Sequence, residues 1–243
     1  MFSRIRRVYY DDSYEFYKDD GFRNEIKYTL LPHEYYKLRD YCAGFMDCDV
    51  NAGTDGEYVV KSYYFDTLKF DDYMEKQSGI YNRKKYRLRT YGDNGEFRLE
   101  KKVKRGQLNK KFSGKISASD ADLLIAGQTN IITGSDDADS IISEMHLKGY
   151  RYSVYIEYER QAFILKEIDL RVTFDKGLGA IYGNYGLNET MPEPIPVFYM
   201  GETIMEIKFR DSLPLWLNRA VYSIAPSEFS ISKYEEALKG VIG

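Results

Sequence analysis

The fold is decided by residues 83–106, which read RKKYRLRTYGDNGEFRLEKKVKRG. Two alternating stretches, Arg83–Tyr91 and Phe97–Val103, flank the turn sequence YGDNGE, and this arrangement predicts a β-hairpin. Successive side chains of a strand point to opposite faces. One face of the first strand therefore carries four cations, Arg83, Lys85, Arg87 and Arg89, while Tyr86 and Leu88 lie on the other.

The same alternation appears along the rest of the chain. It predicts strands at Phe22–Leu30, Tyr58–Asp66, Asn109–Lys115, Tyr152–Leu165, Ile168–Asp175 and Thr203–Arg210. Helices are predicted after Pro32, at Ser117–Ala126 and Asp137–Lys148, near Pro214, and at Ser232–Leu238. The glycine- and proline-rich stretch 176–196 is predicted to be a turn and a long loop. These elements predict an α+β fold built on a closed antiparallel β-barrel of about eight strands, with flanking helices.

Length and composition favour one domain at residues 22–243, preceded by an N-terminal arm at residues 1–21. The chain has no apolar run long enough for a membrane span and no secretory signal, so a cytoplasmic protein is expected. Its two cysteines, Cys42 and Cys48, are interpreted as packing residues. With only His33 and His146 available, a bound metal is expected to rest mainly on oxygen ligands, which favours Mg²⁺ or Mn²⁺.

Positive charge is concentrated in one segment of an otherwise acidic chain. Residues 83–111 hold twelve Lys and Arg against three acidic residues, a local charge of +9, whereas the whole chain carries −3. A solvated sheet face is one explanation. Four like charges on one face are costly, however, and a bound polyanion would compensate them. Nucleic-acid binding is disfavoured because the aromatic residues of these strands lie on the opposite face. Inward-facing cations would make the barrel a basic tunnel.

Several motifs together resemble the catalytic domain of vacuolar transporter chaperone (VTC) polyphosphate polymerases, in the CYTH or triphosphate tunnel metalloenzyme superfamily. The resemblance runs from about Phe22 to the C-terminus. It rests on RNEIKYTL, SYYFDT, YRLRTYG, FRLEKKVKRG, YERQAF, LRVTFDKGL, IMEIKFRDSLPLWL and SEFSISKYEEAL in this order. Each motif alone is weak, but their order and coverage make the resemblance specific.

The resemblance implies a transfer of the terminal phosphoryl group of ATP to inorganic polyphosphate, with Mn²⁺ or Mg²⁺. The residues expected to act in this transfer are Lys27, Arg87, Arg89, Lys102 and Arg171. Further cations expected to bind substrate phosphate are Lys76, Lys85, Lys111, Arg160, Lys208 and Lys233, and the metal is expected on Glu206. Arg160 shares its strand parity with Ile156 and Tyr158, so its inward placement depends on a bulge.

The first strand departs from the superfamily pattern Glu-x-Glu-x-Lys. Arg23 stands at the position of the first glutamate, which leaves one fewer carboxylate for a metal and favours a polymerase. Two alternatives remain open, a triphosphatase of the same fold and a module that binds polyphosphate or nucleotide without catalysis. The chain also lacks the membrane segments that accompany this domain in fungal complexes, so a separate membrane protein partner is expected.

Overall fold

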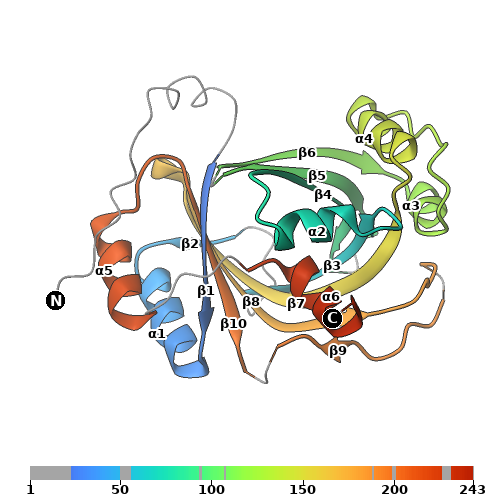
Figure 1. Ribbon diagram of the computed structural model, residues 1–243. Coiled ribbons are helices and arrows are strands. Elements are labelled where there is room, and N and C mark those ends of the chain that lie inside the picture. Colours follow the sequence, from blue (N-terminus) through green and yellow to red (C-terminus); the bar gives the residue numbers. More distant parts are fainter. Residues whose placement is uncertain are drawn as a thin grey trace.

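The computed structural model describes residues 23–49, 56–92, 95–106, 108–187, 189–198, 201–225 and 231–242. Eight of its strands pair antiparallel in a closed ring, because β8 hydrogen-bonds to both β10 and β7 (Figure 1). The order around the ring is β7 (Arg151–Leu165), β3 (Glu57–Asp66), β4 (Asn82–Tyr91), β5 (Phe97–Arg105), β6 (Leu108–Ile116), β1 (Arg23–Leu30), β10 (Thr203–Phe209) and β8 (Leu170–Ile181). The predicted closed antiparallel α+β architecture is therefore confirmed, whereas the predicted arm at residues 1–21 lies outside the described residues.

The alternation of charged and apolar residues decides which face of each strand points into the ring. In the β4–β5 pair, Arg87 lies opposite Glu100 and Lys85 opposite Lys102. In the β1–β10 pair, Lys27 lies opposite Glu206. The alternate residues, such as Leu88, are fully buried beneath helices outside the ring. The charged faces of these four strands therefore meet across the ring interior.

Two helix pairs cover the outer face of the ring (Figure 1). The helix α4 (Asp136–Leu147) packs on β5 and β6, and α3 (Ala118–Ile125) packs on β7. Both helices share one core with apolar residues of β4 and β5. A β-carbon at Gly114 of β6 would lie 2.5 Å from the backbone nitrogen of Ala138, so only glycine permits this close approach of α4. The helices α1 (Pro32–Ala43) and α5 (Leu215–Ile224) cover a second core over β1, β8 and β10.

The C-terminal helix α6 (Lys233–Ile242) packs on the inner face of the ring. Its Tyr234, Ala237 and Leu238 are buried against Val60 of β3 and apolar residues of β7, β8 and β10. The interior is thus divided into an apolar part, filled by α6, and a charged part formed mainly by β4, β5, β6, β1 and β10. This division determines which interior side chains remain available to a ligand.

Three elements were not predicted from the sequence: α2 (Asp71–Gln77) and the two-residue strands β2 (Asp47–Cys48) and β9 (Ile195–Pro196). The N-cap residue of α2 is Phe70, whose side chain cannot cap, and Thr67 Oγ1 accepts a hydrogen bond from the backbone N–H of Asp71 at 3.2 Å. The Asp66 carboxylate accepts hydrogen bonds from the next two backbone N–H groups, those of Asp72 and Tyr73, and caps this far upstream have no local sequence signature. None of the described helices is long and apolar enough to cross a membrane.

The prediction of a loop from residue 176 onward was wrong for its first six residues, because β8 continues to Ile181. Gly177 adopts a φ of 60°, a left-handed conformation that glycine reaches without steric cost. The β7–β8 register shifts between Glu157 and Glu159 at this level. A bulge of this kind allows a strand to continue through a glycine-rich segment that reads as a turn.

Candidate functional site

The ring interior brings together most of the basic residues singled out from the sequence. They come from β1, β4, β5, β6, β7, β10 and the start of α6, with four acidic residues between them. The cations are Lys27, Lys85, Arg87, Arg89, Lys102, Lys111, Arg160, Lys208 and Lys233, and the acidic residues are Glu25, Glu100, Asp175 and Glu206. This cluster is called the interior charge cluster below, and its cations outnumber its carboxylates.

Glu100 anchors the part of the interior charge cluster nearest to β4. Its side chain has no exposed surface, and Arg87 approaches one carboxylate oxygen through Nε and Nη2, each at 2.7 Å. Lys111 lies 2.9 Å from the other oxygen. Burial alone would raise the pKa of Glu100, but Arg87, Arg89 and Lys111 outweigh it and hold that pKa far below its usual value. Glu100 is therefore an ionised partner of Arg87 at all physiological pH values.

Arg89 is held differently, although it is the next inward residue of the same strand. Its Nε donates to Ser62 Oγ at 3.1 Å and its Nη2 donates to Tyr158 Oη at 3.1 Å. The Glu100 carboxylate is 4.0 Å away, and only 5% of the Arg89 side chain is exposed. Arg89 thus donates to neutral hydroxyl groups, and its nearest carboxylate among the described residues is one that it shares with Arg87 and Lys111.

Arg160 points into the ring, although its strand parity with Ile156 and Tyr158 argued against this from the sequence. Those two residues also face inward, because α6 makes that part of the interior apolar. Arg160 forms a fork with the Asp175 carboxylate at 2.6 and 2.7 Å, and Lys233 approaches the same carboxylate at 2.6 Å. Burial would raise the pKa of Asp175, but Arg160 and Lys233 together lower it to about 2.

Two carboxylates and three lysines meet where β1, β10 and β5 face one another. Lys27 Nζ is 3.2 Å from Glu25 Oε1 and 3.4 Å from Glu206 Oε2. Lys102 is 2.7 Å from Glu25, and Lys208 is 2.5 Å from Glu206. Burial opposes ionisation of Glu206, but the surrounding lysines hold its pKa well below the usual value. Both carboxylates are thus ionised and available to a cation.

The chain just before α6 contacts two further interior lysines. Lys85 Nζ donates to Ser232 Oγ at 2.5 Å and lies 5.5 Å from the centre of the Tyr234 ring. Lys27 Nζ also donates to the Ile231 carbonyl at 3.2 Å. Burial is the largest influence on Lys85 and lowers its pKa to about 8. Lys85 therefore carries a weakly compensated charge.

Two of the residues expected in the site lie at its edge. Arg171 donates to Asp49 at 2.5 Å and to Tyr58 Oη at 3.1 Å, and its buried Nε has no partner among the described residues. Lys76 lies on α2 and pairs with Glu235 of α6 at 3.2 Å. Lys76 is thus linked to the position of α6 rather than to the interior carboxylates.

Sequence reasoning missed four interior residues, Tyr64, Tyr158, Asp175 and Ser232. Asp175 shares its strand parity with Arg171 and Thr173, and that signal could have identified it. Tyr64 and Tyr158 occupy positions that read as ordinary core residues in a chain with 24 tyrosines. Their hydroxyl groups acquire a role only when β3 is placed between β7 and β4, which no local sequence pattern shows.

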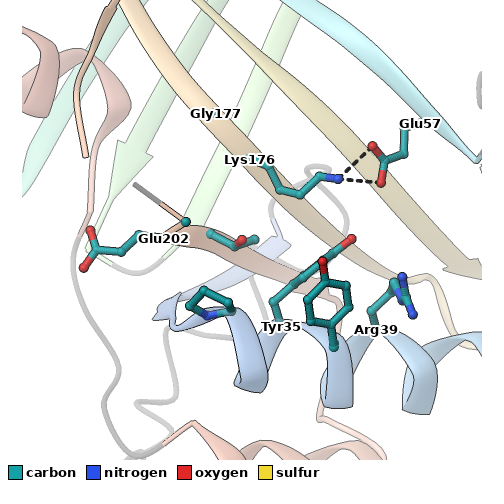
Figure 2. A pocket seen from close by; sticks show the side chains of 10 residues that line it. Tyr35, Arg39, Glu57, Lys176, Gly177 and Glu202 are labelled. Carbon is teal, nitrogen blue, oxygen red and sulfur yellow. Dashed lines mark hydrogen bonds and ion pairs between the residues drawn. The ribbon is translucent and has the colours of Figure 1, made fainter. Parts of the chain in front are cut away.

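A pocket of about 290 Å³ lies outside the ring, between α1, the start of β3, and the segment before β10 (Figure 2). Its lining includes Tyr35, Arg39 and Glu202, and its Lys176 is paired with Glu57 at 2.7 Å. None of the residues predicted for the site lines this pocket. We therefore assign the candidate site to the interior charge cluster.

Solved structures share this fold at low sequence identity. HpAC1 from Hippeastrum, named as an adenylyl cyclase and described as having a dominant triphosphatase activity, is 14% identical with a TM-score of 0.57. The alignment covers 90% of this chain and 96% of that one. A protein from Bacillus halodurans named as an adenylate cyclase is 13% identical with a TM-score of 0.51, over 92% of this chain and 100% of that one. A comparison with curated proteins found no match.

A comparison with family models gave a match that covers nearly all of the chain. The model of the VTC domain matches residues 22–242, which include every strand of the ring and the whole interior charge cluster. The strand order, the inward cations and this match agree with one another. The chain therefore belongs to the VTC domain family.

Proposed function

We propose that this chain is a metal-dependent polyphosphate polymerase that transfers the terminal phosphoryl group of ATP to a growing polyphosphate chain inside the ring. One observation carries the proposal: Arg89 and Lys85 are cations inside a closed ring, and their close partners are neutral. Buried cations are stabilised by an anion that replaces the lost hydration. A chain of phosphoryl groups supplies several negative charges at a spacing that mixed arginine and lysine walls can follow.

The proposed reaction requires no nucleophile from the protein. A terminal oxygen of polyphosphate forms a bond to the γ-phosphorus of ATP, while the bond from that phosphorus to the β,γ-bridging oxygen breaks and ADP leaves. Such transfers depend mainly on positioning and charge neutralisation. Arg87 and Arg89 lie two residues apart on one face of β4 and would hold oxygens of adjacent phosphoryl groups. The other interior cations would hold the rest of the polyanion.

The acidic residues of the ring fit a metal that arrives with its substrate. The described parts of the chain contain no group of three or more His, Cys, Asp or Glu side chains that could hold a metal alone. Mg²⁺ and Mn²⁺, however, commonly use one or two carboxylates together with substrate phosphates. Glu206 would hold the ion with Glu25 nearby, and the ion would neutralise charge on the phosphoryl oxygens.

A triphosphatase is the second candidate, because the same cations would also stabilise transfer of a phosphoryl group to water. The two reactions differ in product. We expect the purified chain, given ATP, Mn²⁺ and a short polyphosphate primer, to lengthen the acid-labile polymer by one phosphoryl unit for each ADP released. Orthophosphate as the sole phosphate product would instead support hydrolysis. Tight binding of tripolyphosphate without either product would support a binding module, which would serve a separate membrane partner at the cytoplasmic face.

Glutamine in place of Glu206 is expected to raise the Mn²⁺ concentration needed for half-maximal activity by about tenfold, since a charge-assisted contact is lost. Glutamine keeps the side-chain volume, so the change tests charge rather than packing. The measurement is the rate of ADP release against Mn²⁺ concentration. Glu96→Gln is the matched control, because that carboxylate pairs with Lys115 and Arg98 on the surface. An unchanged Mn²⁺ requirement in Glu206→Gln would remove this residue from the metal site.

Affinity for tripolyphosphate is expected to fall as pH rises through about 8, the lowered pKa of Lys85. Below this pH the lysine is charged and attracts the anion, whereas above it the charge is lost in the ligand-free protein. The contribution of Lys85 to folding has the opposite sign. Its buried cation destabilises the fold below pH 8, and this penalty is relieved between pH 8 and the unfolded value of 10.5.

Binding isotherms between pH 7 and 10 test this expectation. Lys85→Arg keeps its charge over the whole range and should retain affinity to higher pH than the wild type. Lys37→Arg, on the exposed side of α1, is the control and should follow the wild-type profile. A Lys85→Arg profile that coincides with the wild-type profile would show that Lys85 does not contact the anion.

A further inference from the structure

The hydroxyl of Tyr64 lies beside Arg87 of the interior charge cluster. Tyr64 belongs to β3, its side chain is buried, and its ring stacks on that of Tyr234 with centroids 5.2 Å apart. Its oxygen accepts a hydrogen bond from Arg87 Nη1 at 3.2 Å. Within the described residues, no protein group accepts a hydrogen bond from the Tyr64 hydroxyl. The phenol is thus held in place but has no partner for its proton.

The charged and titratable groups around this hydroxyl and around Arg87, its hydrogen-bond donor, are predominantly cationic. They come from β4, β5, β7 and α6, and they are Lys85, Arg87, Arg89, Glu100, Tyr158 and Lys233. Glu100 is the single carboxylate in this set, and it is bound to Arg87 and Lys111. A cation cluster with so few carboxylates is stabilised by any further negative charge. A phenol that loses its proton supplies such a charge.

Tyr58 provides a comparison on the same strand and the same face. Its oxygen also accepts from an arginine, Arg171, but Asp49 pairs with that arginine at 2.5 Å. Burial, the largest influence, and nearby Asp49 both favour the neutral phenol, and the pKa of Tyr58 is raised. For Tyr64, burial alone would likewise raise the pKa, but Arg87 and Arg89 outweigh burial and lower it to about 7.

We propose that Tyr64 is the internal counter-ion of the empty site: its hydroxyl is deprotonated while the ring holds no anion and takes up a proton from solvent when phosphoryl groups enter. The inference rests on the proposed function, because the entering anion is a triphosphate or polyphosphate. The phenolate limits repulsion among Lys85, Arg87 and Arg89 in the resting protein. After protonation, the phenol no longer repels the phosphoryl oxygens, and its O–H can donate to one of them. Substrate binding is therefore coupled to proton uptake.

The first test uses the ligand-free protein and does not depend on any activity. Phenolate absorbance followed from pH 5 to 11 should show one tyrosine that titrates near pH 7 in the wild type. Tyr64→Phe should lack that transition. Tyr63→Phe is the matched control, because Tyr63 is the neighbouring residue on the outer face and burial raises its pKa to about 12. A wild type without a tyrosine transition below pH 9 would overturn the proposal even if polymer synthesis is observed.

The second test measures protons taken up when tripolyphosphate binds at pH 8. Calorimetry in two buffers of different ionisation enthalpy gives this number, and the wild type should take up about one proton more than Tyr64→Phe. The phenolate absorbance of the wild type should disappear on the same addition, which gives a readout even if Tyr64→Phe folds poorly. If both proteins bind tripolyphosphate and take up the same number of protons, the proposal for Tyr64 is refuted, whereas the proposed function is not. A wild type that titrates near pH 7 but binds no tripolyphosphate would instead refute the proposed function.

Discussion

Alanine in place of Arg89 is expected to lower the kcat/KM of polyphosphate synthesis by roughly ten- to hundredfold, because a charged hydrogen bond contributes about 1.5 to 3 kcal/mol. Arg89 is buried in the ring, and among the described residues its nearest carboxylate oxygen lies 4.0 Å away. Its close hydrogen-bond partners are neutral hydroxyl groups, which charged phosphoryl oxygens would replace. The fold should tolerate the change with a loss of about 1 kcal/mol, since the arginine donates only to the hydroxyls of Ser62 and Tyr158.

Arg87→Ala, on the same strand, is expected to affect both substrate binding and the stability of the fold. We expect a similar loss of kcat/KM, but also a loss of about 3 kcal/mol in the free energy of unfolding, because the fully buried Glu100 keeps only Lys111 as a close partner. Steady-state kinetics and urea unfolding of both variants measure the two effects. Arg87→Ala is therefore expected to destabilise the fold more than Arg89→Ala does.

A lysine substitution at position 89 and a control substitution of Arg39, which lies outside the ring, complete this experiment. Lysine at position 89 should recover part of the activity but not all of it, since an ammonium group cannot reproduce a two-pronged contact. Arg39→Ala is the control, because Arg39 lies on α1 outside the ring and pairs with the exposed Asp40. Near-normal synthesis and tripolyphosphate affinity in both Arg87→Ala and Arg89→Ala would show that the inward face of β4 is not the substrate site.

Strand parity explains why much of the ring could be predicted from the sequence. Residues two apart on one strand must share a face, so the alignment of Arg87 with Arg89 and of Glu206 with Lys208 follows from spacing alone. Parity also identifies the apolar residues that α1, α3, α4 and α5 cover. These inferences need only the geometry of one strand at a time.

The pairing of charges across the ring could not be predicted in the same way. Lys102 contacts Glu25, which is 77 residues distant in the chain, and that contact depends on how far each strand is shifted along its neighbour. The position of α6 inside the ring is a second example. Its sequence predicts a helix, but nothing in it distinguishes packing on the inner face from packing on the outer face. Ile156 and Tyr158 point inward because α6 packs on the inner face and covers them.

Asparagine in place of Asp175 is expected to lower the free energy of unfolding by about 3 to 5 kcal/mol, the effect of removing one partner from a buried ion pair. Asp175 has no exposed surface, and it is the carboxylate that both Arg160 and Lys233 contact. Asparagine has nearly the same volume, so the loss would come from two buried cations without their counter-ion. Because Lys233 is the first residue of α6, we also expect faster amide hydrogen exchange in that helix.

The pH dependence of stability gives an independent measure of the same contact. The pKa of Asp175 is lowered to about 2 from 3.8, so its stabilising contribution is complete above pH 3.8 and is lost as pH falls toward 2. Asp175→Asn should lack this step in acid unfolding curves. Glu57→Gln, which breaks a partly exposed pair with Lys176, is the control and should change stability by less than about 1 kcal/mol.

Tripolyphosphate should restore part of the stability that Asp175→Asn loses. An anion bound inside the ring can take the place of the missing carboxylate beside Arg160 and Lys233. A ligand that binds only the folded state stabilises it by about 2.7 kcal/mol at one hundred times its Kd. We therefore expect tripolyphosphate, at a fixed multiple of each protein's Kd, to abolish the extra hydrogen exchange in α6. A variant as stable as the wild type, or an α6 that stays unprotected with the anion bound, would show that Asp175 does not connect the phosphate site to the C-terminal helix.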